Sequence, residues 1–202
     1  LNRVTVRRLM FAFGALLLFV LAVKGADVFS DAYSLWKHGM RLKALAENPD
    51  QVLDAKEPER IGADLLAIES ALRDLRAELQ ADLRPAWLPW SAARHNLAAL
   101  DELLGVAADV ARAGQVANLG LQSLSQAISN RDTPTGAESE LGLSEAMYQG
   151  LVKARPYFGQ AAQMLEAVNG QLTPLQQSQL WSPLPRLIDT LSGYLQFGAS
   201  GL

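Results

Sequence analysis

The stretch IGADLLAIESALRDLRAELQADL, residues 61–83, decides the fold class of this chain. Its large apolar residues recur mostly at alternating spacings of four and three, with charged residues between them. The recurring positions are Ile61, Leu65, Ile68, Leu72, Leu75, Leu79 and Leu83. This period places them on one helix face and is typical of a coiled-coil-like seam. Because Pro85 disfavours helix in the residue before it, the pattern predicts a helix over 57–83.

Similar seams run through the rest of the chain. The predicted helices cover 28–47, 57–83, 92–129, 139–168 and 173–198, and the last is interrupted at Ser182-Pro183-Leu184-Pro185. Short polar turns separate them, and no segment alternates with the period of a strand. Short connections favour antiparallel neighbours. The sequence therefore predicts an all-α fold, in which a single N-terminal transmembrane helix continues into an antiparallel bundle of long helices.

Details of the third and fourth helices follow from small residues and prolines. Gly114 and Ala117 interrupt the seam of the third helix and predict a close helix approach. In the fourth helix, Pro156 predicts a kink or break near Arg155, and Asn169-Gly170 is expected to end the helix. The apolar face predicted for the fourth helix consists of Leu151, Phe158, Ala161, Leu165 and Val168.

The N-terminus predicts a membrane anchor. Residues 9–23 are uncharged and mostly apolar, and arginines precede them in the tail over 1–8. A cleaved signal peptide and a buried soluble helix are the alternatives, but Lys24 interrupts the cleavage pattern and no polar residue breaks the run. We expect an anchor over 9–27, a cytoplasmic N-terminus and an extracytoplasmic bundle over 28–202. Gly14 and Ala15 form a candidate helix contact within the membrane.

The segment LRPAWLPWSA, residues 83–92, is a hinge rich in tryptophan and proline over 84–91. At about 1.5 Å per residue, the helix over 57–83 returns roughly as far as the preceding segment extends, so the hinge comes back to the membrane surface. The same arithmetic brings Trp181 there. Arg84, Trp87 and Trp90 suit a bilayer interface or a partner contact. Tryptophans beside prolines more commonly pack over the end of a helical bundle, and this interpretation stays open for Trp87 and Trp90.

Little in the sequence predicts chemistry. The net charge of −3 does not favour nucleic acid, and the absence of cysteine excludes thiolate chemistry. The two histidines, His38 and His95, have no carboxylate or second histidine at ligand spacing, so both are interpreted as structural or exposed. The acidic residues at 101, 102, 109, 138, 140 and 145 are interpreted as solvated or as helix-start residues. We expect no enzyme activity, cofactor, metal or small-molecule substrate.

Four aromatic residues are candidates for contact with a pigment or a quinone. They are Tyr33, Trp36, Tyr157 and Phe158. Aromatic residues at helical spacing more often belong to a core, and we expect these four to do so.

The order of a basic tail, a span, long Leu/Ala helices, LRPAWLPW and PLPRLIDTLSGYL resembles the N-terminal part of the bacterial membrane proteins of domain-of-unknown-function family 4012. The resemblance covers the whole chain. It implies that a mixed extracytoplasmic domain, opened by an Asn…Glu…Arg…Gly-Gly segment, follows the helical part in that family, and this chain ends before such a segment. No activity is established for the family, so the resemblance implies no catalytic residue.

These observations predict a non-enzymatic scaffold or interaction protein of the bacterial cytoplasmic membrane. Its partners would be membrane lipid and other membrane-protein subunits, and it could serve as an accessory subunit of a larger, even bioenergetic, complex. The alternative is the N-terminal part of a longer cell-envelope enzyme or assembly factor, with its active domain beyond Leu202.

Overall fold

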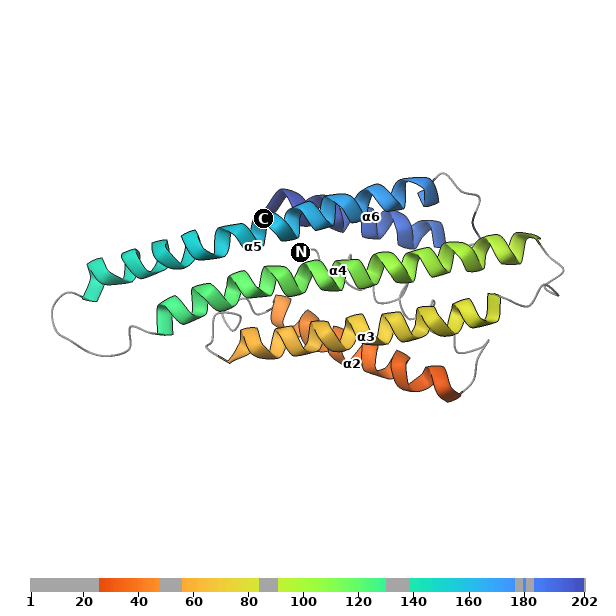
Figure 1. Ribbon diagram of the computed structural model, residues 1–202, viewed down its shortest axis with the longest axis horizontal. Coiled ribbons are helices and arrows are strands. Elements are labelled where there is room, and N and C mark those ends of the chain that lie inside the picture. Colours follow the sequence, from red (N-terminus) through yellow and green to blue (C-terminus); the bar gives the residue numbers. More distant parts are fainter. Residues whose placement is uncertain are drawn as a thin grey trace.

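The computed structural model describes residues 26–47, 56–83, 91–129, 139–176, 180 and 184–201 (Figure 1). These ranges are helical except at Lys56 and Leu180 and contain no strand, which confirms the all-α prediction. The helices are α2 (Ala26–Glu47), α3 (Glu57–Leu83), α4 (Ser91–Ser129), α5 (Ser139–Gln176) and α6 (Leu184–Gly201).

Each described helix packs antiparallel against its neighbour in the chain. In the contacts between chain neighbours, residue numbers rise along one helix as they fall along the other. These contacts are His38–Asp64 and Arg41–Glu57, Arg76–Asp101 and Asn118–Pro58, Gly120–Phe158 and Gly150–Ala127, and Ser192–Asn169. The result is an up-and-down arrangement, with α2 and α3 on one side of α4 and with α5 and α6 on the other (Figure 1).

The seam of residues 61–83 packs as the sequence predicts. Ile61, Leu72, Leu75 and Leu79 are buried. The three leucines belong to one apolar cluster, and Ile68 packs against it. This first cluster joins α3 to Leu35 of α2 and to one face of α4. Burial of apolar side chains on a period of 3.5 residues therefore holds α2, α3 and α4 together.

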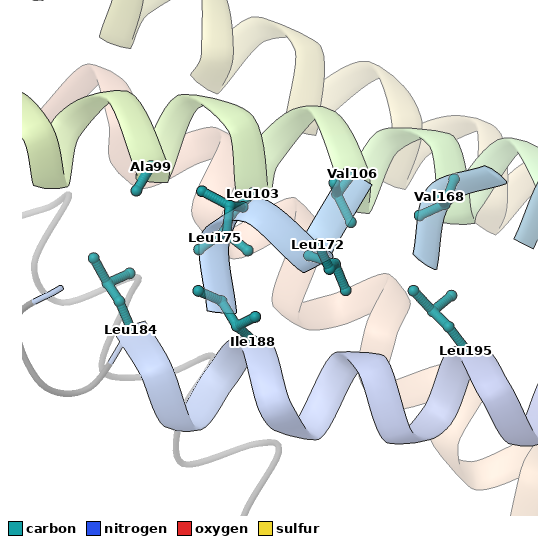
Figure 2. Close-up of a cluster of buried hydrophobic side chains, with 9 residues drawn as sticks. All are labelled: Ala99, Leu103, Val106, Val168, Leu172, Leu175, Leu184, Ile188 and Leu195. Carbon is teal, nitrogen blue, oxygen red and sulfur yellow. The ribbon is translucent and has the colours of Figure 1, made fainter. Parts of the chain in front are cut away.

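A second apolar cluster joins α4 to α5 and α6. In Figure 2, the α6 residues Leu184, Ile188 and Leu195 point toward Leu172 and Leu175 of α5. The α4 residues of this cluster are Ala99, Leu103 and Val106. None of these three belongs to the seam that spacing predicts in the first half of α4, which runs through Leu97, Leu100, Leu104, Ala107 and Val110. Helix α4 is buried on two faces because it lies between two layers of helices, whereas a single seam predicts only one buried face.

Helix α5 passes through Pro156 without the predicted break. Proline donates no hydrogen bond, so the carbonyl of Val152 loses its helical partner. Pro156 and Val152 are both exposed, so water can bond that carbonyl. On the opposite face Ala154 and Ala161 are fully buried. Packing on that face therefore holds the helix together across the proline.

The predicted end of the fourth helix at Asn169-Gly170 is wrong, because α5 continues to Gln176. The Asn169 side chain accepts a hydrogen bond from Ser192 of α6 (3.0 Å) instead of capping its own helix. Beyond it, Leu172 and Leu175 are buried in the second cluster. Their burial outweighs the cost of roughly 1 kcal/mol for a glycine inside a helix.

Glycines set the close approach of neighbouring helices. A Cβ at Gly114 would lie 3.2 Å from Leu65 Cδ2, which confirms the close approach predicted there. A Cβ at Gly150 would lie 3.0 Å from Ala127 Cβ and 3.4 Å from the backbone Cα of Leu124. A Cβ at Gly159, nine residues further along α5, would have no neighbouring atom within 4 Å.

This difference predicts opposite effects of one substitution at two sites of α5. Gly159→Ala should raise the free energy of unfolding by about 0.5–1 kcal/mol, because alanine is the better helix former. Gly150→Ala should lower it by about 1 kcal/mol, because overpacking against α4 outweighs that gain. Urea unfolding of the full chain in mild detergent, followed by circular dichroism, measures both. Equal gains at both sites would contradict the close packing at Gly150.

None of the described helices has both the length and the apolar character needed to cross a membrane. The predicted anchor over 9–27 lies outside the described residues except for its last two positions.

Candidate interaction surface

The residues that the sequence singled out as contacts lie outside the described ranges. They are Gly14, Ala15, Arg84, Trp87, Trp90 and Trp181. The helix ends that flank them are described. The start of α2, the end of α3, the start of α4, the end of α5 and the start of α6 all lie toward one end of the molecule (Figure 1). We call this the near end.

A charged cluster joins α2 to α3. Asp64 is only 3% exposed, and His38 Nδ1 lies 2.8 Å from its Oδ1. A carboxylate only accepts hydrogen bonds, so Nδ1 is the donor. Arg41 Nη1 donates to the same oxygen at 3.5 Å and lies 3.3 Å from Oδ2, where the geometry makes no hydrogen bond. Asp64 of α3 therefore binds two side chains of α2, His38 and Arg41, and so links the two helices.

The cluster continues to the start of α3. Glu57 pairs with Arg41 of α2 (3.6 Å) and with Arg60 one turn later (2.6 Å). The backbone carbonyl of Pro58 accepts a hydrogen bond from the buried Asn118 of α4 (2.7 Å). Polar contacts thus fix α3 to both of its neighbours at the end away from the near end.

Two more carboxylates tie α3 to α4. Glu69 is buried, accepts a hydrogen bond from Gln115 of α4 (2.6 Å) and pairs with Arg73. Arg76 donates to both oxygens of Asp101 at 3.1 and 3.3 Å. The hydrogen bond to Asp101 raises the pKa of Arg76, so this guanidinium stays charged. The interpretation of Asp101 as a solvated surface residue is therefore wrong.

The charged cluster is a structural contact, and sequence spacing could not reveal it. His38 and Asp64 are 26 positions apart, on different helices. His95 is exposed on α4. Among the residues that the structure describes, no three histidine or acidic side chains come together as a potential metal site.

Five of the eight large apolar residues that are exposed in the described part of the chain lie toward the opposite end of the molecule. Asn118 faces the second residue of α3, so α4 beyond it extends past the start of α3. Among the described helices its main neighbour there is α5, although Gln122 of α4 still lies near Gly62 of α3 (Figure 1). We call this part, residues 119–129 of α4 and 139–157 of α5, the distal arm.

The distal arm carries an apolar stripe on the outer face of α5. The stripe consists of Met147, Tyr148, Leu151 and Val152, which are 43%, 61%, 52% and 51% exposed. The prediction that Leu151 faces the core is wrong. Gly150 and Ala154 face α4 instead, because their small size allows the two backbones to come close. Adjacent exposed apolar side chains are typical of an interaction surface.

Two aromatic residues of α2 are also on the surface. Tyr33 and Trp36 are 56% and 49% exposed, and their ring centroids lie 6.4 Å apart. They are not part of the core, contrary to the expectation from helical spacing. Phe158 is half-buried against Gly120, and Tyr157 is half-buried too.

Comparisons of the chain with protein-family models, with curated proteins and with solved structures give no match. The resemblance to family 4012 therefore remains a prediction from sequence pattern.

Proposed function

We propose that this chain is a non-enzymatic, membrane-anchored scaffold whose near end lies at the bilayer and whose distal arm contacts protein. The apolar run over 9–23 supplies the anchor, and α2 begins three residues after it. The observation that carries the proposal is the antiparallel order of the helices. It brings the helix ends that flank the tryptophans at 87, 90 and 181 to the same end as the start of α2.

The dimensions support this arrangement. Position 150, which is level with the apolar stripe along the helix, lies 26 residues before the end of α5. At about 1.5 Å per residue this is roughly 40 Å from the near end. The tryptophans would then meet the interface, where amphipathic rings are enriched, while the stripe stands clear of lipid. A helical bundle that holds a binding face at a fixed distance from the membrane suits a scaffold or an accessory subunit.

Quenching of tryptophan fluorescence by brominated lipid tests the position of the near end. In proteoliposomes of the full chain, we expect strong quenching that falls in the Trp87→Phe/Trp90→Phe variant. Trp36→Phe is the matched control. Trp36 is ten residues into α2 and about 15 Å from its start, so its removal should leave the quenching of the remaining emission undiminished.

The same membranes test the scaffold role. After solubilisation in mild detergent, the chain should elute at a fixed ratio with other membrane proteins, identified by mass spectrometry. Quenching that does not depend on Trp87 and Trp90 would contradict the membrane-facing near end. A chain that is released from membranes by carbonate and elutes alone would contradict the proposal as a whole.

A further inference from the structure

The apolar stripe has no covering element among the described helices. Helix α6 cannot reach it, because Ser192 faces Asn169 and α6 ends nine residues later, at Gly201. Helix α3 begins opposite Asn118, before the distal arm. Single exposed apolar residues are common on protein surfaces, but four neighbours within two helical turns are not.

We propose that the stripe binds the same stripe of a second copy of this chain, with the two α5 helices antiparallel. The contact is centred at the level of residue 150 along α5, although Gly150 itself faces α4. In such a pair, residues equally far before and after Gly150 face each other. Tyr148 of one copy then meets Val152 of the other. The contact is isologous, so both copies use the same surface and the assembly closes as a dimer.

The charges that flank the stripe favour the antiparallel direction. Glu145 lies five residues before Gly150, and Arg155 lies five residues after it; both are exposed. In the antiparallel pair each Glu145 therefore faces Arg155 of the other copy, at both edges of the apolar contact. A parallel pair would place Glu145 against Glu145 and Arg155 against Arg155. Opposite charges stabilise a helix pair and like charges destabilise it, so these charges favour the antiparallel pair of α5 helices over the parallel one.

The stripe is also small, which sets the strength of the contact. Two or three helical turns bury much less than the roughly 800 Å² that each partner contributes to a standard interface. We therefore expect a weak, reversible dimer. Lipid is the less suitable occupant, since the stripe lies about 40 Å from the near end; this comparison rests on the proposed function, whereas the pairing of charges does not.

Antiparallel pairing has a geometric consequence. The near ends of the two copies point in opposite directions. If the near end faces a bilayer, as we propose above, the paired copies are anchored in two facing membranes. The distal arms then meet midway between them.

Disulfide trapping tests the direction of the pair, because the chain has no cysteine and so no background. Full-length Glu145→Cys and Arg155→Cys chains are mixed in mild detergent and oxidised. The mixture should cross-link and each variant alone should not, because like positions lie ten residues, about 15 Å, apart along the antiparallel pair. Gly170→Cys, at an exposed and open position of the same helix, should stay monomeric in every mixture.

Charge reversal tests the pairing independently. Glu145→Lys or Arg155→Glu should each weaken dimerisation roughly tenfold in sedimentation velocity, because each alters two ion pairs. The double variant should recover the affinity of the original chain. A chain that stays monomeric at all concentrations, cross-linking of Glu145→Cys with itself, or a double variant as weak as the single ones would overturn the proposal. These experiments in detergent do not involve the quenching of tryptophan fluorescence by lipid. The dimer and the membrane-facing near end can therefore be disproved independently.

Discussion

Replacing Leu172 with alanine is expected to lower the free energy of unfolding by about 3–4 kcal/mol. The Leu172 side chain is fully buried at the centre of the second apolar cluster, among residues of α4, α5 and α6 (Figure 2). Removing its methyl groups costs their transfer free energy and leaves a cavity that three long helices cannot close. For a chain of this size the loss corresponds to roughly 6–16 °C in Tm.

The control for this prediction is Leu66→Ala. Leu66 is 58% exposed on α3, so the same substitution should change the free energy of unfolding by no more than about 0.5 kcal/mol. Urea and thermal unfolding of both full-length variants, measured side by side, give the comparison. A Leu172→Ala variant as stable as Leu66→Ala would show that the second cluster does not form.

Replacing Asp64 with alanine is expected to cost about 3 kcal/mol and to loosen α2. The substitution leaves the His38 and Arg41 side chains at the α2–α3 interface without the carboxylate that they share. Removing one partner of a buried ion pair costs about 3–5 kcal/mol, and we take the lower end because Arg41 is 42% exposed and can turn to water. Hydrogen exchange measured by mass spectrometry should therefore quicken in residues 26–47 more than in α5.

Two further variants separate the contact of Asp64 from general damage. Asp74→Ala removes an exposed carboxylate from the same helix and should change the stability by less than about 0.5 kcal/mol. A double-mutant cycle of Asp64→Ala and His38→Ala should give a coupling of about 1 kcal/mol or more. Additive effects of the two substitutions would mean that the hydrogen bond between them contributes nothing.

Local pattern was sufficient to predict most of the helix bounds. It was wrong between the last two helices, where it ended the fourth at 168 instead of Gln176 and began the fifth at 173 instead of Leu184. The apolar period over 57–83 and Pro85 predicted the bounds of α3, and the start of α4 differs from the prediction by one residue. These features depend on residues near one another in sequence. The buried face of α6, at Ile188 and Leu195, follows from the same periodicity.

Features that depend on which helices become neighbours were not predictable in this way. A period of 3.5 or 3.6 residues identifies one apolar face, so it missed the second buried face of α4 at Leu103 and Val106. Likewise Leu151 matched the predicted face of α5, but packing turned Gly150 toward α4 instead. The pairing of His38 with Asp64 depends on the register between two helices, which no local pattern encodes.

The order of the interfaces along the chain has a consequence for how this protein folds. The four most extensive interfaces between the described helices all join chain neighbours. Most contacts are therefore local and loop closure is short, which favours fast folding. The first apolar cluster needs only residues up to Ala108, and the second adds α5 and α6 to the other face of α4. During synthesis the first layer can therefore form before α5 exists. It then presents the finished face of α4 as a template on which the second layer assembles.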